Sequence, residues 1–488
     1  MKKFRIFPLL LLLCLLLGAV SPCAWALEAP ELNGQAAILV DLDGGRVLYG
    51  YHMDDERAPA SLTKVMTVLL ALEAISAGRA TLDDMVVAQD DCLQGLEEDS
   101  STSGIVPGTQ ISMKDLLYCA MLHSANEACN IIGRYLAGSI SGFIDQMNQK
   151  AEQLGCKHTH FVNTNGLPAE DHYSSAFDQY LIFAAAMKYP LFMEIANTTS
   201  YQAACAVVNN GEPIVNSNAL INITSIYSNG GRYLYEGASG GKTGYTRAAG
   251  YCLISTAQRG GIRLLAVVMG CDGALNAQIE DYYNFIDSRT LYDWAFDNFS
   301  YQTLLSTSEV VERVEVDLAE GDGMAMLRPA EDITVLLPNG ISEDELRREV
   351  VLYNDNLRAP IPAGTVLGEV RISIGSTVYG TAKLVNGSDV ELSRNAFLAQ
   401  RLGEILQKPW VITLMCVLAV FLLLYIVLIT RYRRLRRKHL RERRRAEKRR
   451  REEELARRKA GITYSRVDPE ERYDFGSDVS ALFDDEDP

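Results

Sequence analysis

Ser61 and Lys64 are the first residues whose types and spacing could do chemistry. They form an SxxK motif at the start of the apolar segment PASLTKVMTVLLALEAI, where Pro59 and Ser61 are start signals for a helix. Positions i and i+3 share a helix face, so the two side chains should meet. An uncharged lysine there could take the proton of the serine hydroxyl, and a backbone N–H at the helix start could stabilise an oxyanion. The pair therefore indicates a serine nucleophile with a lysine base.

The triplet Ser124-Ala-Asn126 also stands where a helix is expected to begin. Its serine could relay a proton, and the amide of Asn126 could hold the carbonyl of a bound peptide. Each of these motifs alone is weakly specific, because Ser239 and Lys242 form another SxxK pair and residues 393–395 another SxN triplet. Only the combination of motifs in order makes the interpretation specific.

The third motif is Lys242-Thr243-Gly244, inside the stretch GASGGKTGYT. Lys242 could bind a substrate carboxylate and, as a second cation, lower the pKa of Lys64, which burial would lower as well. The hydroxyl of Thr243 adds a donor, and Gly244 leaves room for a ligand beside the strand. The order SxxK, SxN and KTG, on helix, helix and strand, is much less expected by chance than any one motif.

The stretch GASGGKTGYT has two other readings, which the surrounding residues exclude. A phosphate loop, GxxxxGK[ST], needs a glycine at the position of Glu236. A hydrolase elbow around Ser239 needs a helix directly after it and a later histidine. A strand pattern follows instead, and the only later histidine is His439, beyond a hydrophobic segment.

The sequence predicts no cofactor and no metal site. His158 and His160 would point to the same face of a strand, but no third ligand is evident, and HEXXH is absent. The cysteines that precede the hydrophobic C-terminal segment and follow residue 26 are scattered and lack CxxC spacing. We expect them to be small buried thiols rather than a disulfide framework or a zinc ribbon.

The two ends of the chain predict export and membrane insertion. Residues 1–26 combine basic residues, an apolar run and Ala-Trp-Ala, as in a removed signal peptide. A lipoprotein site at Cys23 is disfavoured by Pro22. Residues 410–430 carry no charge and are long enough to cross a membrane as a helix. The basic run that follows should keep the tail, residues 431–488, cytoplasmic, with the preceding domains outside the membrane.

Charge argues against a nucleic-acid partner. The formal net charge of the chain is −15, and the tail holds a large share of the 47 lysine and arginine residues. The part outside the membrane is therefore more acidic than the whole chain, which disfavours binding to a polyanion. The basic part of the tail is interpreted as a topology signal in contact with anionic lipid.

The periodicity of the chain predicts an α+β domain with a mostly antiparallel sheet over residues 27–305. Residues 36–50 indicate a hairpin with a Gly-Gly turn, and residues 250–271 a second pair of strands. Helical spacing is found over residues 112–137, 141–154, 177–188 and 279–299. Short strand patterns then predict a small all-β domain over residues 306–393, followed by a membrane-proximal helix over residues 394–409.

On these motifs the chain resembles the serine D-Ala-D-Ala carboxypeptidases of the low-molecular-mass penicillin-binding protein family. The resemblance extends from Ala36 to about Ser393 and rests on five ordered blocks. The blocks are APASLTKVMT, GTQISMKDLLYCAMLHSANEACN, FVNTNGLPAEDHYSSAFDQ, GGKTGYTRAAGYCLISTA and PAGTVLGEVRI. Family members are typically anchored by an amphipathic C-terminal helix, whereas this chain has a full span and a charged tail.

The resemblance implies a penicillin-interactive, β-lactamase-like fold and removal of the terminal D-alanine from peptidoglycan stem peptides. The reaction would pass through an acyl-serine, with Ser61 as the nucleophile, Lys64 as its base and Ser124 as a third catalytic residue. β-Lactam antibiotics would act as covalent inhibitors. The expected partners are thus the stem peptide, β-lactams and the membrane.

The resemblance also implies a set of substrate-binding residues. Asn126 would line the cleft, and Lys242 and Thr243 would hold the terminal carboxylate. Gly244 would leave room for the substrate, and the backbone N–H of Tyr245 would complete the oxyanion hole with that of the nucleophile.

Two alternatives share these motifs. A class A β-lactamase would need a glutamate that directs the deacylating water, usually in an ExxLN context, and none lies between the SxN and KTG blocks. A catalytically weak penicillin-binding sensor that signals through the tail would not need to keep the lysines and serines of these motifs, and this chain keeps them. Both are therefore less favoured than a carboxypeptidase.

Overall fold

The computed structural model describes residues 27–274 and 280–461. The predicted signal peptide, residues 1–26, and the acidic end of the predicted tail, residues 462–488, lie outside the described residues. Contacts divide the chain into two compact units, the second of which consists mainly of the chain from Val390 onward.

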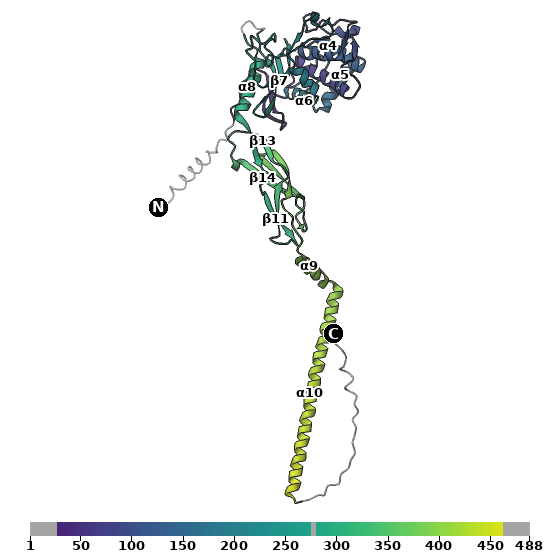
Figure 1. Cartoon of the computed structure of the whole chain (residues 1–488), viewed down its shortest axis with the longest axis vertical. Helices are drawn as coiled ribbons and strands as arrows, with labels where there is room; N and C mark the ends of the chain where they lie inside the picture. The colour runs from purple at the N-terminus through teal and green to yellow at the C-terminus, as the bar shows by residue number, and fades with distance from the viewer. Residues whose placement is uncertain (1–26, 275–279, 462–488) are drawn as a thin grey trace, which may run out of the picture. The chain divides into compact units, whose positions relative to one another are not determined.

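A five-stranded antiparallel sheet is the centre of the N-terminal part (Figure 1), with the strand order β2-β1-β9-β8-β7. Its strands are β1 (Ala36–Asp41), β2 (Arg46–Tyr51), β7 (Ala238–Thr246), β8 (Gly250–Arg259) and β9 (Ile262–Cys271). The predicted opening hairpin is β1 and β2, and the predicted second pair is β8 and β9. The two pairs join into one sheet because β1 pairs with β9, so strands from both ends of the domain meet as expected.

The helices lie between β2 and β7, apart from α8, which follows β9. They are α2 (Lys64–Ser76), α3 (Met113–Leu122), α4 (Asn126–Ala137), α5 (Ile140–Gln153), α6 (Ala176–Ala186), α7 (Pro190–Asn197) and α8 (Tyr283–Asn298). Short strand pairs also occur here, β3 (Met85–Val87) with β4 (Gln110–Ser112) and β5 (Ser200–Tyr201) with β6 (Ile214–Val215). The predicted helical stretch 112–137 is thus two helices, divided at Ser124, whose φ is 58°.

Alternation along β1 explains why the sheet is covered on both faces. Ile38 and Val40 belong to a core shared with α2, α3 and α4. Ala37 and Leu39 belong to a second core shared with α8. Successive strand residues point to opposite faces, so a strand that is apolar at every position must be buried on both sides. In Figure 1, α8 and the group α4, α5 and α6 accordingly lie on opposite sides of β7.

Strand β7 forms an edge of this sheet, because only β8 pairs with it. At Gly244 the turn that precedes α2 lies against this strand. A Cβ on Gly244 would meet the Ser61 nitrogen at 3.1 Å and the Ala60 Cβ at 3.2 Å. The fold therefore brings the SxxK and KTG motifs into direct contact.

The chain after α8 forms an all-β region, as predicted. Its strands are β10 (Phe299–Leu305), β11 (Glu312–Asp317), β12 (Met324–Pro329), β13 (Ile333–Pro338), β14 (Leu346–Leu352), β15 (Leu357–Arg358), β16 (Val366–Ile374) and β17 (Thr377–Asn386). The antiparallel pairs are β10 with β13, β14 with β16, β16 with β17, β17 with β12 and β12 with β11. Strand β10 precedes residue 306 and was not expected from the sequence.

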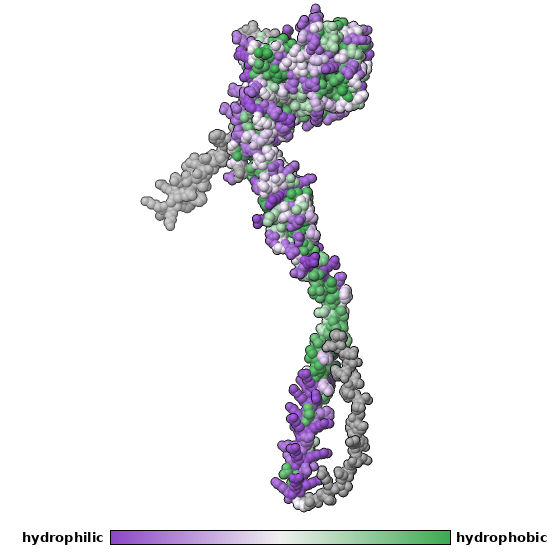
Figure 2. Space-filling view, viewed as in Figure 1, coloured by the Kyte–Doolittle hydropathy of each residue, from purple (hydrophilic) through white to green (hydrophobic). Residues whose placement is uncertain are grey.

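Two helices end the described chain. The predicted membrane-proximal helix is α9 (Arg394–Leu406), and the predicted span lies within α10 (Pro409–Lys459). By length and composition α10 could cross a membrane. Figure 2 shows apolar side chains over its first part and hydrophilic ones over the rest. Because α10 continues through the basic run, the apolar and basic segments are one continuous helix.

Candidate active site

Ser61 lies in a single 3₁₀ turn, η1 (Ala60–Thr63), directly before α2. A 3₁₀ helix has three residues per turn, so side chains three positions apart lie one above the other. The Lys64 Nζ is accordingly 2.8 Å from the Ser61 Oγ. The sequence predicted this contact from helical spacing, and the 3₁₀ turn aligns the two side chains more directly than an α-helix would.

Three acceptors surround the amine of Lys64. Besides the Ser61 hydroxyl, they are the Asn126 Oδ1 at 2.7 Å and the backbone carbonyl of Asn165 at 2.7 Å. An ammonium group donates to all three, whereas a neutral amine has two N–H groups and one lone pair. When Asn126 and Asn165 accept both remaining protons, the lone pair is directed at the Ser61 hydroxyl. The geometry thus suits a base without any rearrangement.

The two lysines of the site are buried, and burial lowers the pKa of both. The Lys64 side chain is fully buried, which lowers its pKa to about 8. The pKa of Lys242 is held well below its ordinary value by burial and by the nearby Lys64 ammonium. Burial therefore acts on the pKa of Lys64 as expected, and the two neighbouring ammonium groups disfavour each other.

Ser124 and Lys242 form a second contact beside this pair. The Lys242 Nζ donates to the Ser124 Oγ at 3.1 Å and to the Thr243 carbonyl at 2.8 Å. Ser124 has a left-handed backbone, which non-glycine residues adopt only where the surroundings impose it, often at functional sites. The break between α3 and α4 therefore directs this hydroxyl toward Lys242 and the Asn126 side chain toward Lys64.

The side chains of β7 supply the opposite wall of the site. The Thr243 hydroxyl forms a hydrogen bond with the Ser217 hydroxyl. Gly244 allows the close approach to Ser61 described above, as its position in a strand predicted. Tyr245 is 37% exposed and packs on Tyr251, with ring centroids 4.4 Å apart.

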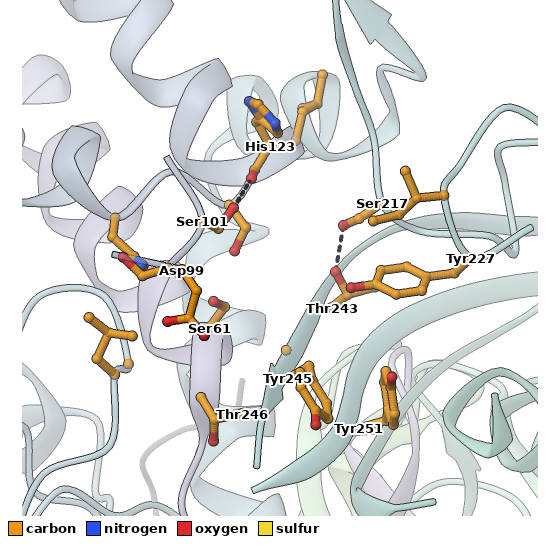
Figure 3. Close-up of a pocket in the computed structure, with 18 of the residues that line it drawn as sticks. Ser61, Asp99, Ser101, His123, Ser217, Tyr227, Thr243, Tyr245, Thr246 and Tyr251 are labelled. Atoms are coloured by element: carbon orange, nitrogen blue, oxygen red, sulfur yellow. Dashed lines mark hydrogen bonds between the residues drawn. The ribbon is translucent and has the colours of Figure 1, made fainter. Parts of the chain in front are cut away.

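A cavity of about 880 Å³ opens over these groups. Six of the eight predicted residues line it, namely Ser61, Ser124, Asn126, Thr243, Gly244 and Tyr245. In Figure 3, Ser61 and Asp99 lie on one side of the cavity and face Thr243, Ser217 and Tyr227 on the other. Lys64 and Lys242 lie behind the wall, with exposed fractions of 0% and 1%. The structure therefore brings all eight residues together, two of them as buried lysines.

Several residues of the site carry no motif that would have identified them. Asn165 contributes only a backbone carbonyl, and Ser217 reaches Thr243 from a loop 26 residues earlier in the chain. Glu127, next to Asn126, is fully buried, and its Oε1 accepts from the Ser103 N–H at 2.6 Å. The one signal available was the Asn-Gly dipeptide at Asn165, which marks a turn but no function.

The candidate metal ligands are not brought together. His158 lies 3.5 Å from a carboxylate oxygen of Glu56, whereas the His160 Nδ1 contacts the backbone carbonyl of Asp171 at 2.7 Å. Only His160 takes part in a β-bridge, so the expected strand over both histidines is wrong. The described residues contain no group of three or more histidine, cysteine or carboxylate side chains that could hold a metal ion.

Gly166 allows the turn that carries Asn165 to pack on the SxxK motif. A Cβ at this position would lie 1.8 Å from the Ala60 carbonyl oxygen, and the φ of Gly166 is +97°. We expect Gly166→Ala to displace the Asn165 carbonyl from Lys64 and to lower kcat/KM for release of D-alanine by about 10²-fold, the typical effect of a displacement near 1 Å. Steady-state kinetics on the folded variant measures this effect.

The matched control is Gly155→Ala. Gly155 also has a positive φ, +84°, but an added Cβ would meet nothing within 4 Å. It therefore introduces similar backbone strain away from the cavity. If both variants lost activity to the same degree, close packing against Ala60 would not be what Gly166 provides.

Comparison with known proteins assigns the family. The sequence model of D-alanyl-D-alanine carboxypeptidases matches residues 24–273, and that of the penicillin-binding protein 5 C-terminal domain matches residues 299–392. The D-alanyl-D-alanine carboxypeptidase DacF of Bacillus subtilis is 29% identical over 81% of this chain and 97% of its own length. DacA of Escherichia coli K12, also named a D-alanyl-D-alanine carboxypeptidase, is 30% identical over 72% of this chain and 82% of its own.

Solved structures agree with the sequence relatives. Penicillin-binding protein 5 from Haemophilus influenzae superposes with a TM-score of 0.57 and 27% identity, covering 75% of this chain and 99% of its own. Penicillin-binding protein 6B from Escherichia coli gives a TM-score of 0.56 and 26% identity, covering 74% of this chain and 98% of its own.

Fold and site define a serine-type hydrolase of the penicillin-binding class. The chain belongs to the D-alanyl-D-alanine carboxypeptidase family and is a serine D,D-carboxypeptidase.

Proposed function

We propose that this enzyme removes the terminal D-alanine from peptidoglycan stem peptides through an acyl-Ser61 intermediate. The observation that carries the proposal is the hydrogen bonding of Lys64, whose two carbonyl acceptors leave its lone pair for the Ser61 hydroxyl. A buried lysine with a pKa of about 8 is uncharged in a useful fraction of molecules near neutral pH. No cofactor or metal takes part in the proposal.

In the first step Ser61 attacks the carbonyl carbon of the scissile peptide bond, and Lys64 takes the hydroxyl proton. The negative charge that develops on the carbonyl oxygen would be held by the backbone N–H groups of Ser61 and Tyr245. The close contact between Gly244 and the Ser61 nitrogen supports this assignment, because it brings the backbone of β7 beside that N–H. One such donor typically contributes 10²–10³-fold in kcat.

In the second half of acylation the departing amine must receive a proton. Ser124 is suited to pass it on, because its hydroxyl accepts from Lys242 and lines the cavity. The Thr243 hydroxyl is suited to bind the terminal carboxylate, with the charge of Lys242 directly behind it. Asn126 would hold the substrate carbonyl in addition to its contact with Lys64. Once the proton that Lys64 took from Ser61 has passed to the departing amine, Lys64 is again free to act as the base when water hydrolyses the acyl-serine.

The same serine would be acylated by β-lactams, which present a strained amide to the nucleophile.

We further propose that the apolar part of α10 anchors the enzyme in the membrane, with the catalytic domain outside and the basic continuation of α10 in the cytoplasm. The charge-free stretch of residues 410–430 followed at once by a basic run supports this topology. The acidic character of the remaining chain supports the absence of a nucleic-acid partner.

The test is release of D-alanine by the full-length protein in detergent from a peptide that ends in Lys-D-Ala-D-Ala. We expect one D-alanine per peptide, and we expect prior treatment with benzylpenicillin to abolish release. A protein that hydrolyses benzylpenicillin rapidly and leaves the peptide intact would contradict the proposal in favour of a β-lactamase. A protein that binds penicillin but never turns over the peptide would instead be a sensor.

A further inference from the structure

Arg247 is an exposed arginine that lines the catalytic cavity, three residues after Gly244. Among the described residues on the cavity wall, it is the one lysine or arginine, since Lys64 and Lys242 are buried behind the wall. Within residues 27–274 and 280–461, no carboxylate forms an ion pair with Arg247. The cavity therefore presents a single cationic side chain that the protein itself does not neutralise.

The position of Arg247, in the turn directly after β7, indicates which part of a substrate it would meet. Gly244 contacts the turn of Ser61, so the scissile carbonyl must lie beside it. Thr243 and Ser217 lie on one side of this point and provide hydroxyl groups for the departing D-alanine. Arg247 lies on the other side, beyond Tyr245 and Thr246 and directly after the end of β7, toward the acyl part of the peptide.

Negative charge lies in the same cavity. Glu97 and Asp99 line it, and neither forms an ion pair with a lysine or arginine in the described part of the chain. In Figure 3, Asp99 lies near Ser61, on the side away from Thr243 and Ser217. The cavity thus presents hydroxyl groups toward the departing D-alanine and side chains of both charge signs elsewhere on its wall.

We propose that Arg247 determines specificity by binding a carboxylate on the side chain of the acyl-side residue of the stem peptide. The preferred residue then has a side chain that ends in both a carboxylate and an ammonium group, the latter attracted by Glu97 and Asp99. Guanidinium is the cation best matched to a carboxylate because it can donate two parallel hydrogen bonds. This inference rests on the proposed function, because it concerns the substrate of the same cleft.

The experiment uses the full-length protein and two peptides of equal length that end in X-D-Ala-D-Ala. X is lysine in one and meso-2,6-diaminopimelate in the other, which differ by one terminal carboxylate. We expect wild-type kcat/KM to favour the diaminopimelate peptide about fivefold, the size of a partly exposed arginine–carboxylate pair. In Arg247→Gln the ratio should fall to about one. Added salt should reduce the wild-type ratio, because exposed charge pairs are screened.

The control is Arg259→Gln, since Arg259 is another exposed arginine of the same sheet, paired with Asp293 and outside the cavity wall. It should keep the wild-type ratio. A wild-type ratio near one, or a ratio that survives Arg247→Gln, would overturn the inference. Failure of the proposed function would look different, because then neither peptide would release D-alanine at all.

Discussion

Replacing Lys64 by methionine is expected to reduce kcat/KM for D-alanine release by about 10³-fold or more and to prevent acylation of Ser61. Methionine fills a similar volume but cannot accept a proton, so the Ser61 hydroxyl loses its base. The three hydrogen bonds of the amine are lost at the same time, including those that position the Asn126 side chain. Stopped-flow acylation by a β-lactam and steady-state peptide hydrolysis measure the two losses separately.

Two further variants show whether the loss is specific to Lys64. Lys150→Met removes a lysine that forms an ion pair with Glu73 on the helical side of the domain, and it should leave acylation within a factor of about two. His123 is the one histidine among the described residues on the cavity wall, and its Nδ1 contacts the Ser103 hydroxyl at 3.0 Å. If His123→Ala abolished acylation as completely as Lys64→Met, a histidine rather than the lysine would be the base.

Replacing Lys242 by methionine is the second change with a large expected effect, and its signature is in the pH profile. The two buried ammonium groups disfavour each other, so the lysine pair should hold one proton near neutral pH. In the wild type that proton can lie on Lys242 while Lys64 is free to act as the base. Without Lys242 the remaining proton can lie only on Lys64, whose pKa is about 8.

We therefore expect Lys242→Met to lower kcat/KM at pH 7 by about 10²-fold, because Ser124 also loses its proton donor. The direction of the pH effect follows from the pKa of Lys64, because Lys64 acts as a base only after it has lost its proton. As pH rises through about 8, Lys64 loses its proton, and the variant should recover part of its activity. The acid limb of the variant's pH–activity profile should therefore lie at higher pH than the acid limb of the wild-type profile. A variant whose pH profile coincides with the wild-type profile would show that the two lysines are not coupled.

The parts of the site that the sequence predicted are those in which local geometry does the positioning. Ser61 and Lys64 are three residues apart, and any right-handed helical turn brings them onto one face. The KTG motif could be assigned to a strand because a strand pattern, rather than a helix, follows it. Three such local elements in a fixed order were enough to predict the site, and strand patterns at both ends of the domain predicted the antiparallel sheet.

The parts that the sequence did not predict depend on contacts between distant segments. The carbonyl of Asn165 reaches Lys64 across 101 residues, and a backbone atom leaves no trace in the residue type. Burial of Lys64 was expected from its apolar helix, but the equally complete burial of Lys242 was not, because it follows from how the helices pack on the sheet rather than from the motif. The sequence marked Ser124-Ala-Asn126 as the start of a helix, but it did not predict the left-handed backbone of Ser124, which depends on tertiary contacts.

The most direct test of the catalytic arrangement is mass spectrometry of the full-length enzyme after treatment with benzylpenicillin. If the Lys64 amine activates the hydroxyl that lies 2.8 Å away, the digest will show a single penicilloyl group on the peptide that contains Ser61, and Ser61→Ala will show none. An adduct on Ser124 or Ser239, or no adduct in an otherwise folded protein, would contradict the assignment of the nucleophile.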